Sequence, residues 1–308
     1  MNVLETNSLS KRYGRLAALQ DLTLTVPGGA VGLLGPNGAG KSTLIKILLG
    51  LIPATAGSAA VFGLDVRRFR LHVRQQVGYM PENESFIPGL DAVRYVYLAG
   101  RLIGMPHIDA MQRTHIVLNY VGLGEERYRP MQDYSTGMKQ KVKFAQAIVH
   151  HPKLLLLDEP TSGLDPRARE EMLGLIRDVA HGKGIHVIIS THILPDVEAT
   201  CDDVVIMDRG ALVQQGPIKG LSAGGDGYDV RIKGDRDAFL RALLAHACEA
   251  EAHEDGRIRV RFAHGTPGTD PILRASVEAK VQLRHLERCR ASLEELFGSV
   301  LSRSRNGS

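Results

Sequence analysis

A glycine-rich segment that follows an apolar run has the residue types and spacing needed to bind a chain of phosphates. It reads Gly35-x-x-x-x-Gly40-Lys41-Ser42 and meets every fixed position of the Walker A pattern. Glycines let successive backbone N–H groups point at phosphate oxygens, the lysine reaches the β and γ phosphates, and the serine hydroxyl can ligate Mg²⁺. The residues predicted to contact a nucleotide here are Gly35, Pro36, Asn37, Gly38, Ala39, Gly40, Lys41, Ser42 and Thr43.

Two adjacent carboxylates complement this loop. Asp158 and Glu159 come directly after the four-leucine run Leu154–Leu157, which is typical of a strand buried on both faces. An acidic pair in such a place is often only a helix cap. Together with a phosphate loop, however, it predicts that Asp158 holds Mg²⁺ and that Glu159 orients and deprotonates an attacking water.

The elements around these residues predict an α/β fold. Short apolar runs at Leu22–Val26, Ala30–Leu34, Gln76–Tyr79 and His186–Ser190 indicate further strands, and the segment after the phosphate loop predicts a helix that stops at Gly50. A mostly helical stretch follows from about residue 88 to 151. Unalternated apolar runs favour a parallel sheet flanked by helices, which brings the phosphate loop and the carboxylates to one sheet edge.

A third segment, Tyr134 to Gln140, resembles the signature sequence of the ATP-binding cassette (ABC) family. Ser135 and Gly137 match the LSGGQ consensus, and Tyr134, Thr136 and Met138 give the Y-S-x-G-M-K-Q variant familiar in bacterial export-type cassettes. In physical terms this is a second helix start with a hydroxyl and free N–H groups, which suits an anion, although a simple serine N-cap would have the same residues.

Three more residues fall in the order that this resemblance implies. Asp165, in Ser162-Gly163-Leu164-Asp165, matches the D-loop and would also cap a helix beginning at Pro166. His192, after a predicted strand, matches the switch histidine that contacts the γ-phosphate. Tyr13 matches the aromatic residue that stacks on adenine.

Glu82 is a departure from the family pattern. The family typically has glutamine after the strand at Gln76–Tyr79, and here a carboxylate stands in its place. A carboxylate cannot donate the hydrogen bonds of an amide. We expect Glu82 to contact nucleotide, Mg²⁺ or water.

The chain divides by composition into two domains. The resemblance implies a P-loop NTPase ABC cassette over residues 1–221, with a parallel-sheet core and a helical subdomain at about 84–151. Residues 222–227 would form a linker, and 302–308 a tail. Residues 228–301 would form a small α+β accessory domain, with strands at Tyr228–Lys233, Arg257–Phe262 and Val281–Leu286, and helices at 235–249, from Asp270, and from Ser292.

The composition excludes several classes of protein. The 308 residues, 44% hydrophobic and 23% charged, exclude a disordered chain, and the formal charge of +4 is spread over both halves, which argues against a nucleic-acid-binding tail. Three distant cysteines and the absence of a secretory signal predict a reducing, cytoplasmic location. His285 and Cys289 could form half of a metal site, but a structural role is favoured because no second ligand pair lies near.

The resemblance implies an ATPase that powers transport. Two copies would face each other head to tail and together enclose two ATP with Mg²⁺. This dimer, at the inner face of the cell membrane, would drive export through a separate transmembrane permease. No nucleic-acid partner is expected. The alternative is a cassette ATPase with a regulatory, assembly or ribosome-associated role and no transport.

Overall fold

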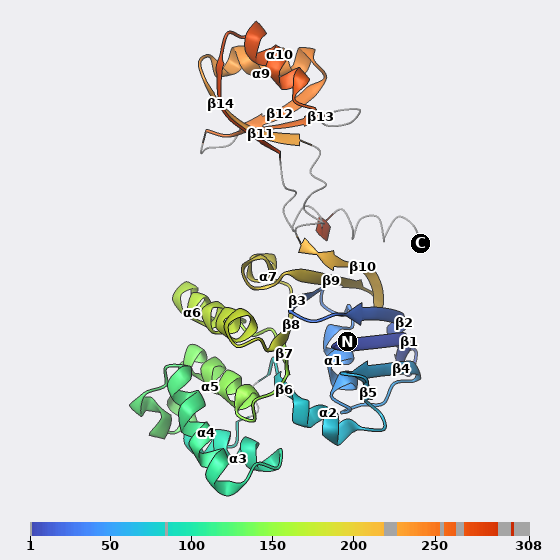
Figure 1. Ribbon diagram of the computed structural model, residues 1–308, viewed down its shortest axis with the longest axis vertical. Helices are drawn as coiled ribbons and strands as arrows, with labels where there is room; N and C mark the ends of the chain where they lie inside the picture. Colours follow the sequence, from blue (N-terminus) through green and yellow to red (C-terminus); the bar gives the residue numbers. More distant parts are fainter. Residues whose placement is uncertain are drawn as a thin grey trace. The chain divides into compact units, whose positions relative to one another are not determined.

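The computed structural model describes residues 2–83, 86–218, 227–252, 256–262, 268–288 and 297–298 (Figure 1). These residues form two compact units, the first ending at Ile218 and the second beginning, among the described residues, at Gly227. The first unit has two sheets and the second has one, and each unit has its own hydrophobic core.

A six-stranded sheet forms the centre of the first unit. Its strands are β3 (Ala30–Leu34), β6 (Val77–Met80), β7 (Leu154–Asp158), β8 (His186–Thr191), β9 (Asp203–Asp208) and β10 (Ala211–Pro217), in the order β10-β9-β3-β8-β7-β6. All neighbours are parallel except the β9–β10 pair. Every residue of β3 and β7 is buried, so the prediction of a parallel sheet covered on both faces is confirmed.

A second, antiparallel sheet in the order β2-β1-β4-β5 completes this unit. Its strands are β1 (Leu4–Tyr13), β2 (Leu16–Val26), β4 (Ala56–Val61) and β5 (Leu64–Asp65). Only the last part of β2 coincides with a strand predicted from the sequence. The others alternate weakly, because polar residues such as those in Asn7–Ser10 interrupt the apolar pattern and β4 is rich in glycine, serine and alanine.

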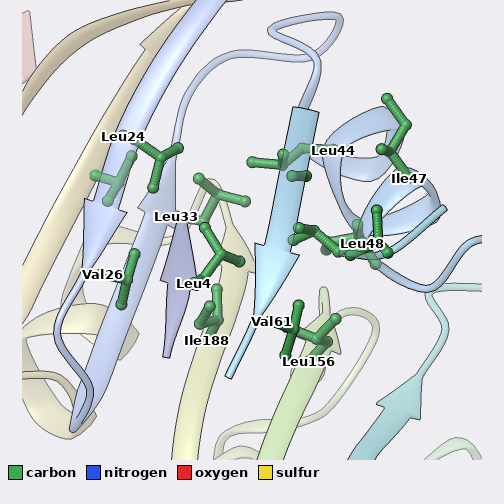
Figure 2. Close-up of a cluster of buried hydrophobic side chains, with 14 of the residues drawn as sticks. Leu4, Leu24, Val26, Leu33, Leu44, Ile47, Leu48, Val61, Leu156 and Ile188 are labelled. Carbon is green, nitrogen blue, oxygen red and sulfur yellow. The ribbon is translucent and has the colours of Figure 1, made fainter. Parts of the chain in front are cut away.

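The core lies between these two sheets and α1 (Lys41–Leu48). Figure 2 shows Leu4, Leu24 and Val26 from the antiparallel sheet facing the same interior as Leu33, Leu156 and Ile188 from the parallel sheet. Leu44, Ile47 and Leu48 of α1 pack there as well. Because α1 begins at the end of the phosphate loop, this packing fixes the loop on the core.

Further helices flank the sheet. They are α2 (Arg70–Gln76), α6 (Pro166–Arg177), which continues as a π-helical turn over Asp178–Gly182, and α7 (Leu194–Thr200). The stretch predicted to be mostly helical contains α3 (Ala92–Leu102), α4 (His107–Tyr120) and α5 (Thr136–Ile148), with 3₁₀ turns at Glu125–Tyr128 and Met131–Asp133. Asp91 caps α3 by accepting a hydrogen bond from the N–H of Arg94.

The second unit is an antiparallel sheet with two helices. The chain runs β11 (Gly227–Lys233), α9 (Arg236–Ala245), β12 (Cys248–Ala252), β13 (Ile258–Phe262), α10 (Asp270–Glu278) and β14 (Gln282–Arg288), with strand order β12-β13-β11-β14. Val230, Phe239, Leu243, Val260 and Ile272 form its core. The α+β class expected for this region is therefore the class that the structure has.

The helix predicted over residues 235–249 is too long. It ends at Ala245, and Ala247 adopts a left-handed backbone with φ of 56° before β12 begins at Cys248. Pairing of β12 with β13 decides this segment, although its alanines and glutamates favour helix. Gly227, predicted as the last linker residue, is the first residue of β11. Residues 222–226, the start of the predicted helix at Ser292 and the tail 302–308 lie outside the described residues, whereas residues 297–298 within that predicted helix are helical.

Candidate functional site

The phosphate loop connects β3 to α1 and depends on glycine. Gly40 has φ of 100° as the residue before α1, and a Cβ atom there would come within 2.5 Å of the carbonyl oxygen of Ala18. Only glycine combines this backbone with that close approach. Gly38 also has a positive φ, of 83°, a backbone conformation that glycine adopts readily.

Lys41 is the first residue of α1 and is buried. Its Nζ donates hydrogen bonds to the carbonyl oxygens of Gly35, at 2.6 Å, and Pro36, at 3.3 Å. Burial lowers the pKa of Lys41, while the negative charges of Glu159, Asp158 and Glu82 act in the opposite direction. The fold thus brings the acidic residues from two different segments into the electrostatic environment of the loop lysine.

Asp158 and Glu159 reach this place because β7 ends beside the loop. Asp158 is the last residue of β7 and Glu159 follows it, with 3% and 7% of their surfaces exposed. The strand enters the sheet between β6 and β8, so its carboxyl end lies at the same sheet edge as the end of β3. The phosphate loop and the two carboxylates therefore lie at one sheet edge, as expected from the order of strand and carboxylates.

Two side chains hold the carboxylate of Glu159. The hydroxyl of Thr191 donates to Oε2 at 3.1 Å, and Nδ1 of His192 lies 3.0 Å from Oε1. Both residues stand at the end of β8, the strand next to β7. The His192 side chain is 58% exposed, which leaves the imidazole accessible to a ligand bound at the sheet edge.

The backbone of Glu159 is strained. Its φ is 49°, in the left-handed region that costs a non-glycine residue about 1–2 kcal/mol. Its N–H donates to the carbonyl oxygen of Ser190 at 2.8 Å, and its own carbonyl accepts from the N–H of Ser162. These contacts, together with the side-chain bonds, keep the carboxylate at the sheet edge.

The residues predicted to hold magnesium offer hard oxygen atoms. The Ser42 hydroxyl and the Asp158 carboxylate are ligands of the kind that Mg²⁺ prefers. Ser190 pairs in register with Asp158, and its buried hydroxyl has no hydrogen-bond partner among the described residues. A buried oxygen without a partner beside Asp158 suits a site that takes up a hydrated ion, so the residues present fit Mg²⁺.

Glu82 lies just beyond β6 and is held through its backbone. The ammonium of Lys143, a buried residue of α5, donates to the Glu82 carbonyl oxygen at 2.8 Å. The Glu82 carboxylate contributes to the electrostatic environment of both Lys41 and Tyr79. Burial, together with the charges of Asp158 and Glu82, raises the pKa of Tyr79 to about 12.

Ser135 and Gly137 lie elsewhere. Ser135 is the exposed N-cap of α5, and its hydroxyl accepts from the N–H of Met138 at 3.3 Å. In Figure 1, α5 lies on the side of β6 and β7 away from α1. The described chain therefore does not bring the predicted signature residues to the loop that contains Lys41.

Asp165 and Tyr13 lie at the ends of regular elements. Asp165 caps α6 by accepting from the N–H of Ala168 at 2.9 Å, with Pro166 at the first helical position. Tyr13 is the last residue of β1 and is 46% exposed. The ammonium of Lys11 lies 5.0 Å from the centre of its ring.

Several residues at this edge carry no signal in the sequence. Thr191 stands beside His192, but the sequence does not predict its bond to Glu159. Lys143 is one of several lysines in its helix, and its sequence does not predict its bond to Glu82. Asp196 accepts hydrogen bonds from Thr161 and Arg169, which lie 35 and 27 residues away along the chain. Such long-range bonds have no sequence spacing by which they could be found.

Other potential ligand groups stay apart from this site. His285 lies in β14, 47% exposed and 3.3 Å from a carboxylate oxygen of Glu287, whereas Cys289 is outside the described residues. In the part of the chain that the structure describes, no cluster of three or more histidine, cysteine, aspartate or glutamate side chains could hold a metal ion.

Comparison with known proteins gives a consistent result. The family model described as "ABC transporter" matches residues 19–162. The linearmycin resistance ATP-binding protein LnrL of Bacillus subtilis is 31% identical, covering 98% of this chain and 99% of that protein. The bacitracin transport ATP-binding protein BcrA of Bacillus licheniformis is 33% identical over 97% of each chain. A solved ATP-binding subunit of an ABC transporter is 32% identical with a TM-score of 0.65, covering 72% of this chain and 92% of that one.

Proposed function

This chain belongs to the ABC transporter family and is an ATP-hydrolysing subunit, and on that premise we propose which residues catalyse hydrolysis and what the subunit assembles with. The observation that carries the proposal is the convergence of Lys41, Asp158 and Glu159 at one sheet edge, with His192 bonded to Glu159. A phosphate-binding loop with a buried carboxylate beside it suits hydrolysis of a phosphoanhydride.

Glu159 is the general base. Its carboxylate accepts the proton of a water that attacks the γ-phosphate, while Thr191 and His192 fix its orientation through one oxygen each. Lys41 and the loop N–H groups neutralise the phosphates, and His192, being largely exposed, contacts the γ-phosphate. The loop from Gly35 to Thr43, with Tyr13 stacked on adenine, holds the rest of the nucleotide.

Ser42 and Asp158 hold Mg²⁺, and Glu82 contacts the ion or its water. The ion, when bound, neutralises charge on the β and γ phosphate oxygens. The chain's own contribution is to present these oxygens from three segments: the start of α1, the end of β7 and the loop after β6. The neighbouring hydroxyl of Ser190, buried without a partner among the described residues, supports a hydrated site.

Two copies enclose two ATP molecules head to tail. The support is the position of Ser135 and Gly137 on a helix start that lies across the sheet from α1 (Figure 1). Since one chain cannot bring this helix start to its own phosphate loop, a second copy supplies it. Ser135, Gly137 and Asp165 then contact the nucleotide or the interface of the opposite chain.

A separate transmembrane permease is the partner that uses the hydrolysis. None of the described helices is both long and apolar enough to cross a bilayer. A groove between α2 and α3 is lined by Leu71, Arg74, Ala99, Leu102 and Ile103, and Leu71 and Leu102 are 65% and 80% exposed. Exposed leucines in a groove suit an apolar helix of a partner. We assign the chain to the inner membrane face through this partner.

Export is the proposed direction of transport. Relatives that match over nearly the full length are named for linearmycin resistance and bacitracin transport, and the Y-S-x-G-M-K-Q segment is of the export-type variant. The described residues from Gly227 to Arg288 form a unit of their own. We propose that this unit is an accessory domain of the protein.

The test is a Glu159→Gln variant, studied together with any protein of several apolar spans that the neighbouring reading frame encodes. We expect ATP turnover to fall by about 10²-fold or more, with an ATP-dependent dimer accumulating on size exclusion, and we expect the intact chain to co-purify with that protein from detergent. Wild-type turnover in the variant would remove Glu159 as the base. A complex containing only soluble partners would instead favour a regulatory, assembly or ribosome-associated role.

A further inference from the structure

A buried carboxylate behind the proposed catalytic edge joins three segments of the chain. Asp196, in the first turn of α7, has a side chain only 2% exposed, and both of its oxygens are engaged. Thr161 donates its hydroxyl to Oδ2 at 2.5 Å. Arg169 donates from Nε to Oδ1 at 2.7 Å, and its Nη2 lies 2.6 Å from the same oxygen.

The three segments are those that carry the proposed catalytic groups. Thr161 lies two residues after Glu159, in the turn in which the N–H of Ser162 bonds the Glu159 carbonyl. Asp196 lies four residues after His192. Arg169 is on α6, the helix that Asp165 caps. The Asp196 carboxylate therefore links two segments, the one that follows Glu159 and the one that follows His192, to the helix that begins after Asp165.

The strained backbone explains what this link is for. Glu159 has a left-handed φ of 49°, a conformation that persists only where its surroundings impose it. On its amino side the strand β7 and the bond to Ser190 restrain it. On its carboxyl side, Thr161 lies within the turn that the Ser162 N–H closes, and the Thr161 side chain is bonded to the buried Asp196.

We propose that Asp196 is a positioning residue for ATP hydrolysis, which holds Glu159 and His192 in their mutual geometry through Thr161 and α7. It touches no substrate. The inference rests on the proposed role of Glu159 as the base, because the geometry that Asp196 maintains matters for turnover only if Glu159 acts in the reaction.

Two substitutions separate the parts of this link. Asp196→Asn removes the negative charge that pairs with Arg169 and leaves one acceptor oxygen, so Thr161 and Arg169 can no longer each donate to an oxygen of their own. Thr161→Val removes only the hydroxyl at nearly constant volume. Thr161→Ser keeps the hydroxyl and is the conservative variant that restores the bond.

The experiment measures kcat, KM for Mg-ATP, the dissociation constant of ATP and the melting temperature for each full-length variant. We expect kcat to fall about tenfold or more in Asp196→Asn and Thr161→Val, with ATP affinity within about twofold of wild type, since the phosphate loop is untouched. Thr161→Ser should keep kcat near the wild-type value. The double variant should lose no more than the worse single one, because both act through one bond.

A matched control lies on the same helix. Arg177 pairs with Glu170 on α6 at 2.5 Å, and the two side chains are 41% and 66% exposed. Arg177→Gln should leave kcat and ATP affinity unchanged. It reports what the loss of an ordinary ion pair on α6 does to turnover.

The outcomes decide between the claims. If Asp196→Asn and Thr161→Val lower the melting temperature but keep kcat below that temperature, the link is only structural and the inference is overturned. If Asp196→Asn does not fold, the comparison of Thr161→Val with Thr161→Ser decides. A Glu159→Gln variant with full turnover would refute the base itself, whereas an inactive Glu159→Gln beside a normal Thr161→Val would refute only the role of Asp196.

Discussion

Nδ1 of His192 lies 3.0 Å from Oε1 of Glu159, across two neighbouring parallel strands. Since β7 and β8 are in register, the residue that follows each strand comes to the same sheet edge. The contact is therefore a direct product of strand order, and it joins the proposed base to the residue proposed to contact the γ-phosphate.

Removing this contact should slow hydrolysis more than it weakens binding. We expect His192→Ala to lower kcat at least about tenfold, because the Glu159 carboxylate loses one of its two partners and the phosphate loses a donor. The melting temperature should change little, since the imidazole is 58% exposed. Steady-state kinetics and ATP binding measured on one preparation check this. Unchanged kcat would show that His192 is dispensable.

A methyl group at Gly40 should abolish nucleotide binding. Gly40→Ala adds a Cβ at φ of 100° and 2.5 Å from the Ala18 carbonyl oxygen, so the loop must shift. Gly63→Ala is the control, because Gly63 also has a positive φ, of 74°, but open space around it. We expect a loss of about 1 kcal/mol in unfolding free energy for Gly63→Ala with normal ATP binding, and a larger loss without binding for Gly40→Ala. Equal effects would show that the close approach is unimportant.

The buried ammonium of Lys143 should stabilise the loop that carries Glu82. Lys143→Met keeps the length of the side chain but removes the donor to the Glu82 carbonyl. We expect the unfolding free energy to fall by about 1–3 kcal/mol, and KM for Mg-ATP to rise, in a chemical denaturation and kinetic series. Lys46→Met, at an exposed position of α1, is the control. A variant as stable as wild type, with normal KM, would contradict the role of this bond.

His150 should make the fold less stable in mild acid. Burial lowers the pKa of His150, and its Nε2 lies 3.2 Å from the Val77 carbonyl oxygen. The unfolded chain therefore binds a proton more readily than the folded one, so stability rises with pH through this window and is lost as pH falls from about 6.5 toward the lower folded value. The slope is at most about 1.4 kcal/mol per pH unit for one proton.

Denaturation curves between pH 7 and 5 measure this dependence. His150→Gln keeps a donor for Val77 and should flatten the curve. His151→Asn is the control, since the adjacent His151 is exposed and its φ of 58° is one that asparagine tolerates. If His150→Gln leaves the pH dependence unchanged, other groups cause it.

The sequence was sufficient to locate the sheet edge but not what supports it. Lys41, Asp158 and His192 were predictable because each follows a continuous apolar run, and parallel strands end together. The antiparallel sheet was missed because β4 contains little but glycine, serine and alanine, and its pairing with β1 rather than its own propensity makes it a strand. Likewise, the predicted helix ran on into Cys248 and Glu249, the first two residues of β12, because local preference there opposes the tertiary pairing.

The bonds of Asp196 lie beyond sequence reasoning for a different reason. Asp196 follows a proline in the first turn of a short helix, where an aspartate is favoured by the helix dipole alone. Nothing at that position distinguishes such an aspartate from one that bonds Thr161 and Arg169. Only the packing of α6 against α7 reveals the difference.

The contact of α5 with the turn after Glu159 joins two parts of the chain that the proposed dimer would place at different nucleotides. Gln140 donates to the Ser162 carbonyl at 3.3 Å, and Gly137 packs so close to α6 that a Cβ there would lie 3.3 Å from Ala168. In the proposed dimer, the start of α5 serves the ATP of the opposite copy, whereas Ser162 belongs to the turn beside the chain's own ATP. In that arrangement these two contacts would connect the sites of the two nucleotides within a single chain.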